Sequence, residues 1–119
     1  MEALILVGHG SRRPDANDEV VRLAKRLAGA AAGRFGVVRP AFLEFVSPTV
    51  GEAVAECARA GADSVRLLPY FLAAGRHVTA DLPARLAAAQ AAHPDVDLRL
   101  LPHLGAADGL VDLLLAAAS

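Results

Sequence analysis

The chain has 119 residues, of which 55% are hydrophobic and 21% charged, and its formal net charge is −1. This length and apolar content fit one folded domain over residues 1–119 and exclude a disordered chain. The near-zero charge and the absence of Trp give no general attraction to nucleic acid or to an anionic membrane, so we expect partners of neither kind.

The N-terminal part predicts a buried strand followed by an amphipathic helix. Residues 3–7 form a continuous apolar run that ends at Gly8, which is typical of a strand buried on both faces of a parallel sheet. A helix is predicted over about 15–32, because apolar residues recur there at helical spacing. Its acidic residues come first and its basic residues later, an order that complements the helix dipole.

The next segment predicts a second strand and a second helix. Residues 37–45 are mostly apolar and contain Pro40, which favours an edge position or an irregular start because proline cannot donate to a sheet. The helix that follows runs to about residue 60. It begins either at Ser47-Pro48 or at Thr49, which forms a capping-box pattern with the glutamate three residues later.

The C-terminal half repeats the same pattern twice. Residues 64–68 predict a third strand, and a long loop leads to a helix that is capped by Thr79 or Asp81 and runs to about residue 92. Residues 97–101 predict a fourth strand, and 107–118 a last helix. Four strand–helix units in succession predict a three-layer α/β fold, with a four-stranded, mostly parallel sheet and helices on both faces.

The last predicted helix has no polar face. Its sequence, GLVDLLLAAAS, is apolar on nearly every side. Two interpretations are open: the helix is buried in an oligomer interface, or it covers the core and turns an alanine-rich face to solvent.

Cysteine content and the N-terminus indicate the cellular setting. Cys57 is the only cysteine, so an intrachain disulfide and a cysteine-based zinc cluster are excluded, and its apolar surroundings indicate a buried free thiol. The apolar run at the N-terminus is too short to span a membrane and lacks a basic region. We therefore expect a cytoplasmic protein.

Polar residues follow each predicted strand at its carboxyl end. They are His9 and Ser11 after the first strand, Glu44 at the end of the second, Arg76 and His77 after the third, and His103 after the fourth. Ligands of parallel α/β sheets bind beyond the carboxyl ends of the strands, so His9, Glu44 and His77 are expected to share a site. Two imidazoles and a carboxylate suit an open site for Fe, Co, Ni or Zn.

Two details of this predicted site depend on local structure. Gly8 and Gly10 flank His9 and are expected to let a ligand approach the backbone closely. Glu44 lies in the apolar segment FLEFV, where it either faces solvent by strand alternation or points into a cleft as a proton acceptor. Because parallel strands are usually covered on both faces, the cleft is favoured.

Four segments resemble, in chain order, the sirohydrochlorin chelatases, the class II chelatases of cobalamin, sirohaem and nickel-tetrapyrrole synthesis. These segments are LILVGHGSRRPDAN, FLEFVSPTVGEAV, LLPYFLAAGRHVTADLP and LLPHLG. Together they cover almost the whole chain. The resemblance implies a chelatase-like half domain of the short family form, which pairs as a homodimer.

The resemblance also implies an activity. The chain is expected to be a metal chelatase, a lyase that inserts Co²⁺, or alternatively Fe²⁺ or Ni²⁺, into a sirohydrochlorin-type tetrapyrrole. His9 and His77 would handle the metal, and Glu44 would be metal-associated or accept protons. The metal is then a substrate, and no permanently bound cofactor is expected.

Substrate contacts are expected from Ser11, Arg12 and Arg76, because sirohydrochlorin-type substrates carry many carboxylates that arginine binds well. Two other functions compete with the chelatase. A phosphoryl-handling enzyme with His9 as nucleophile would need arginine where Gly8 stands. A non-catalytic metal- or tetrapyrrole-binding protein would bind the same ligands without turnover.

Overall fold

The fold is a four-stranded parallel sheet in the order β2-β1-β3-β4. The computed structural model describes the backbone of residues 1–119 and every side chain except that of His77. The strands are β1 (Glu2–Gly8), β2 (Val37–Phe42), β3 (Ser64–Pro69) and β4 (Asp97–Leu100), and the helices are α1 (Pro14–Ala30), α2 (Val50–Arg59), α3 (Leu82–Ala92) and α4 (Leu110–Ala118). Short helical turns, η1 (His77–Asp81) and η2 (Leu104–Ala106), precede α3 and α4.

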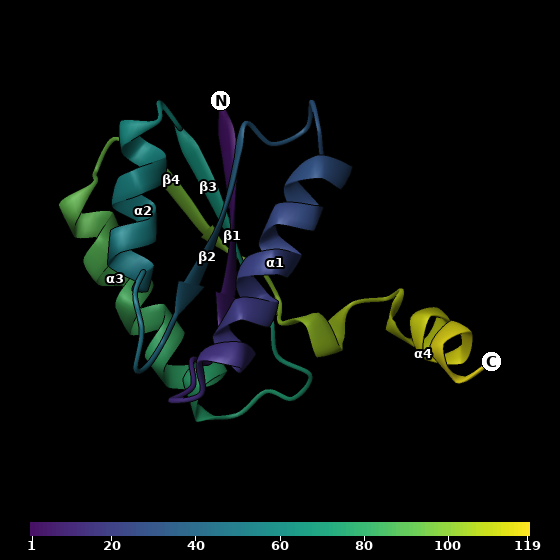
Figure 1. The fold of residues 1–119 in the computed structure, drawn as a ribbon. Coiled ribbons are helices and arrows are strands. Elements are labelled where there is room, and N and C mark those ends of the chain that lie inside the picture. The colour runs from purple at the N-terminus through teal and green to yellow at the C-terminus, as the bar shows by residue number, and fades with distance from the viewer.

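Helices lie on both faces of the sheet, which confirms the predicted three-layer α/β fold. Figure 1 shows α1 on one face, α2 and α3 on the other, and α4 standing apart at the C-terminus. The inner position of β1 in the sheet explains why its sequence is apolar at every position. Ala3, Ile5 and Val7 belong to the core under α2 and α3, whereas Leu4 and Leu6 belong to the core under α1. All five are at most 5% exposed.

The second strand ends earlier than predicted. β2 stops at Phe42, and Phe45 has a φ of 72°, which extended backbone does not allow. The prediction of a strand through residue 45 is therefore wrong at its end, and Glu44 lies beyond the strand. The edge position suggested by Pro40 is confirmed, since β2 is an outer strand of the sheet.

The start of α2 is decided by its cap. The Thr49 side chain accepts the N–H of Glu52 at 3.2 Å, and the Glu52 carboxylate accepts the N–H of Thr49 at 2.8 Å. This capping box satisfies two backbone donors that the helix leaves unpaired. Of the two predicted starts, the one at Thr49 is confirmed and the one at Ser47-Pro48 is wrong.

The interpretation of the last helix as a cover for the core is wrong. No residue of α4 is buried, and Val111, Leu113, Leu114 and Leu115 are between 56% and 66% exposed. The helix also begins later than predicted, at Leu110, because residues 104–106 form a separate short turn. None of the described helices has both the length and the apolar character needed to cross a membrane.

The predicted burial of Cys57 is confirmed and has a consequence for alkaline stability. The side chain is 0% exposed inside α2. Burial raises the pKa of the thiol from 9.0 to about 11, with Arg39 opposing the rise and Glu56 adding to it. Between these two pH values the unfolded chain has lost a proton that the folded chain still holds, so folding stability falls as pH rises.

We expect the free energy of unfolding to drop by up to about 2 kcal/mol across this pH window because of Cys57. Urea unfolding at a series of pH values measures the slope. The Cys57→Ala variant, which lacks the thiol, should show a shallower slope than the wild type. Equal slopes for the two proteins would contradict the assignment.

Candidate functional site

The carboxyl ends of all four strands lie along one edge of the sheet, because the strands are parallel (Figure 1). β1 ends at Gly8, immediately before His9, and β2 ends two residues before Glu44. β3 leads directly to Tyr70 and Phe71. The predicted site residues of the first two strands therefore come together at this edge, where the fold places ligand sites.

His9 and Glu44 form the centre of the described site. The His9 Nε2 and Glu44 Oε2 atoms are 3.3 Å apart, and the two side chains are 49% and 41% exposed. The backbone sets this distance: the N–H of Glu44 donates to the His9 carbonyl at 3.0 Å, and the N–H of Leu43 donates to the Gly8 carbonyl at 3.2 Å. Two backbone hydrogen bonds beyond the end of β2 thus join the two loops and bring a base and a carboxylate together in an open position.

Gly10 allows a close backbone contact that the sequence did not indicate. Its φ is +90°, and a Cβ atom at this position would overlap the backbone carbonyl of Glu44. The close approach that glycine permits in this structure is therefore to the Glu44 backbone, and the approach of a ligand to this loop stays a prediction. Gly10 is required for the contact between the first and second loops of the site.

Phe71 supports the His9 imidazole. The two rings meet edge to face, with centroids 6.1 Å apart and an interplanar angle of 84°. An aromatic edge against an imidazole restricts the ring without occupying a nitrogen. The sequence did not predict Phe71 as a site residue. Its position just after the third strand could have indicated it, because the other predicted site residues also follow strands.

The loop that follows His9 is held in place by hydrogen bonds of Ser11. The Ser11 backbone donates to the Asn17 side chain at 2.9 Å and accepts from it at 2.8 Å, and the Ser11 hydroxyl accepts the N–H of Arg13 at 3.0 Å. Asn17, the one buried polar side chain among the described residues, therefore holds the loop in place. Ser11 shapes the loop and has one hydroxyl hydrogen left to donate.

Arg12 lies over the ring of Phe45, with its guanidinium carbon 4.9 Å from the ring centroid. Both residues line a surface pocket of about 440 Å³, together with Ser11, Pro14, Asn17, Asp18, Val21, Phe42, Val46 and Ser47. His9 and Glu44 do not line it, but it is built from the loops that follow them in the chain. Phe45 was not predicted as a site residue. Its positive φ, which no sequence pattern signals for phenylalanine, places its ring at the surface.

The third predicted loop is only partly described. Arg76 is exposed directly before η1, and His77 is the first residue of η1. The His77 side chain lies outside the described residues, so its predicted meeting with His9 and Glu44 stays a prediction. Among the described side chains, no group of three or more His, Cys, Asp or Glu residues is placed to hold a metal ion.

His103 has a structural contact of its own. Its backbone carbonyl accepts the N–H of Ala106 at 2.9 Å, which closes the η2 turn. The side chain is half-buried. Of the described histidines, His9 is the one that meets a carboxylate.

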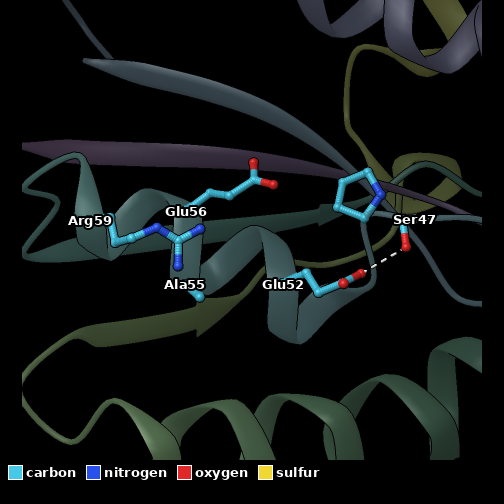
Figure 2. Close-up of a pocket in the computed structure, with 6 residues that line it drawn as sticks. Ser47, Glu52, Ala55, Glu56 and Arg59 are labelled. Carbon is cyan, nitrogen blue, oxygen red and sulfur yellow. Dashed lines mark hydrogen bonds between the residues drawn. The ribbon is translucent and has the colours of Figure 1, made fainter.

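A neighbouring surface pocket of about 460 Å³ lies along α2 and contains none of the predicted site residues. It is lined by Ser47, Pro48, Glu52, Ala55, Glu56 and Arg59, and Figure 2 labels all of these except Pro48. The Ser47 hydroxyl donates to Glu52 at 3.0 Å (Figure 2). The pKa of Glu52 is lowered, first by the backbone N–H of Thr49 and then by this hydroxyl. These groups serve the helix cap.

A comparison with protein families decides the classification. The family model CbiX matches residues 3–119. The chain belongs to the CbiX family. This confirms the resemblance to the sirohydrochlorin chelatases that the four sequence segments indicated.

Curated proteins that are similar in sequence to this CbiX chain are named as sirohydrochlorin chelatases. It is 41% identical over 86 residues to the sirohydrochlorin cobaltochelatase of Methanocaldococcus jannaschii, covering 72% of this chain and 59% of the relative. It is 31% identical over 116 residues to the chloroplastic sirohydrochlorin ferrochelatase of Arabidopsis thaliana, covering 95% of this chain and 49% of the relative. The chain thus spans about half to three-fifths of the length of these relatives.

Solved structures show the same fold. A CbiX protein from Marinobacter aquaeolei VT8 matches with a TM-score of 0.81 and 25% identity, covering 99% of this chain and 94% of that one. The sirohydrochlorin chelatase SirB from Bacillus subtilis subspecies spizizenii, solved in complex with cobalt, matches with a TM-score of 0.84 and 24% identity. This chain covers 49% of that SirB chain, and at this identity the likeness concerns the fold alone.

Proposed function

We propose that this CbiX chain is a sirohydrochlorin chelatase, a lyase that inserts a divalent metal into a sirohydrochlorin-type tetrapyrrole. The observation that carries the proposal is the His9–Glu44 pair, 3.3 Å apart and open to solvent at the carboxyl edge of the sheet. The names of the relatives with 41% and 31% identity support the choice of substrate. Cobalt is the first choice of metal, with iron or nickel as alternatives.

The chemistry of insertion fits these residue types. Two pyrrole N–H groups must each lose a proton as M²⁺ enters, so the products are the metal complex and two protons. Glu44 and a neutral imidazole can accept protons at this position. His9 and His77, with Glu44, would hold the incoming metal loosely, because a closed set of four protein ligands would trap it.

Basic and hydroxyl groups beside the pair would bind the macrocycle. Arg12 lines the pocket formed by the loops after β1 and β2, and Arg76 is exposed just before His77. Guanidinium groups suit peripheral carboxylates, which they bind with two hydrogen bonds. The Ser11 hydroxyl, which lies in the same loop as Arg12, would donate one further hydrogen bond to the macrocycle.

The working unit would be a homodimer in the cytoplasm. One domain of this size can contact only part of a tetrapyrrole, and the relatives named as chelatases are longer than this chain. Two copies would supply the second wall of the cleft. The metal enters as a substrate and leaves in the product, and the proposal includes no permanently bound cofactor.

The decisive experiment is insertion by the purified chain. Sirohydrochlorin is mixed anaerobically with Co²⁺, Fe²⁺ or Ni²⁺ in separate reactions, and formation of the metal complex is followed by absorbance. We expect insertion well above the rate without protein, fastest with Co²⁺. Binding of metal and tetrapyrrole without a rate increase for any metal would overturn the chelatase and favour a non-catalytic binding protein.

A further inference from the structure

The last helix carries an apolar stripe that its own domain leaves uncovered. Val111, Leu114 and Leu115 recur at helical spacing and are 65%, 56% and 66% exposed, so they lie on one side of α4. Asp112 is the only charged residue in the helix and flanks this stripe. Four large apolar side chains exposed on nine residues are typical of a surface that another chain covers.

The same domain contains an apolar groove of about 370 Å³ with no helix in it. It runs between α1 and the sheet and is lined mainly by Leu23, Leu27, Leu68, Tyr70 and Leu104, with Arg26 as its only charged residue. The groove is open because α1 alone covers this face, whereas α2 and α3 together cover the other (Figure 1). A parallel sheet is usually covered on both faces, so this groove leaves room for a further covering element.

The chain's own α4 is directed away from this groove. The N–H of Gly105 donates to the Phe71 carbonyl at 2.9 Å, which ties η2 to the domain. The N–H of Leu110 then donates to Ala107 at 3.1 Å, and the N–H of Leu113 donates to Gly109 at 3.1 Å. This bonded turn points α4 outward (Figure 1), and it would have to open for the helix to fold back.

Charge also matches between the helix and the groove. Arg26 and Asp112 each lack an ion pair within the described part of the chain. One lies in an apolar groove and the other beside an apolar stripe. Opposite charges set in this way favour one orientation of helix and groove and suppress others.

We propose that α4 of each copy packs into the groove between α1 and the sheet of a second copy of this chain, with Asp112 of one copy facing Arg26 of the other. Each copy contributes one α4 helix and one groove, so the dimer contains two identical contacts related by two-fold symmetry. Because both surfaces of both copies are then occupied, no further copy can be added. It assigns a surface to the homodimer of the proposed function and does not depend on chelatase activity.

Charge reversal tests this pairing directly. Arg26→Asp and Asp112→Arg, each alone, place like charges together at both contacts, and we expect the dimer dissociation constant to rise at least about tenfold. An equal mixture of the two variants restores opposite charges at both contacts of a mixed dimer. Sedimentation equilibrium of each variant and of the mixture should therefore show loss of the dimer and its recovery.

A matched pair of variants on α4 tests the apolar stripe. Leu115→Asp puts a charge in the stripe and should give a monomer, whereas Leu113→Asp puts the same charge on the opposite side of the helix and should leave the dimer intact. Circular dichroism checks folding, and both side chains are exposed. Three outcomes would overturn the proposal. The wild-type chain could be monomeric, the Arg26→Asp and Asp112→Arg variants could each dimerise like wild type, or the mixture of these two variants could fail to form a dimer.

The outcome is separable from that of the proposed function, because mass is measured without metal or tetrapyrrole. A dimer with the expected variant behaviour but no insertion would overturn the chelatase alone. A monomer that inserts metal would overturn the α4 exchange and the proposed homodimer, but not the chelatase activity.

Discussion

Glu44→Gln should slow metal insertion by about 10²-fold or more, the usual contribution of a positioned acid–base group. The amide keeps the shape of the side chain and its place 3.3 Å from His9 Nε2, but it cannot accept a pyrrole proton. Since the side chain is partly exposed, the fold should be unaffected. Initial rates with saturating sirohydrochlorin and metal measure the effect.

A matched control uses another paired carboxylate. Glu56 lies on α2, where its Oε2 atom is 3.5 Å from Arg39 Nε, and it belongs to no predicted site. Glu56→Gln should insert metal at the wild-type rate. His9→Ala, which removes the other half of the pair, should reduce insertion to a similar degree as Glu44→Gln. Wild-type rates in both site variants would refute the assignment of the pair.

Gly10→Ala should cause the largest loss of stability among single substitutions in the site, about 2–4 kcal/mol. A side chain at a φ of +90° is strained, and its Cβ would overlap the Glu44 carbonyl. The second loop must then move, so His9 and Glu44 separate and insertion slows as well. Urea unfolding gives the free energy of unfolding, and the insertion assay on the folded fraction gives the second effect.

Gly51→Ala is the control for Gly10→Ala. Gly51 lies in the first turn of α2, and nothing stands within 4 Å of the position that a Cβ would take. Alanine there should be neutral or should stabilise the helix by up to about 1 kcal/mol. If Gly10→Ala were as stable and as active as Gly51→Ala, the claim that Gly10 holds the two loops together would be wrong.

The layers of the fold could be predicted from the sequence because each element carries its own periodic pattern. The run Ala3–Val7 is apolar at every position, and the structure shows why, since alternate side chains enter the two cores on opposite faces of the sheet. The α2 cap was among the predicted alternatives, because Thr49 and Glu52 stand at the spacing that a capping box requires. These signals are local, so they can be recognised without tertiary structure.

The details of the site depended on contacts between segments. Glu44 was predicted within a strand, but it lies in a loop because the backbone turns at Phe45, whose φ of 72° has no sequence signal. Phe71 reaches His9 only because β1 and β3 are neighbours in the sheet. Periodicity does not report such contacts, since they join residues far apart in the chain.

The sequence alone indicated that His9 and Glu44 stand at the carboxyl ends of parallel strands, because alternating strands and helices favour a parallel sheet. The tertiary structure showed that these two strands, β1 and β2, are neighbours in the sheet. Only the tertiary structure decided how they meet. Gly10 lacks a side chain, so the Glu44 backbone packs against it and brings the carboxylate to the imidazole. Tertiary structure likewise decided that α4 leaves its apolar stripe exposed, because the turn before it points the helix away from the groove between α1 and the sheet.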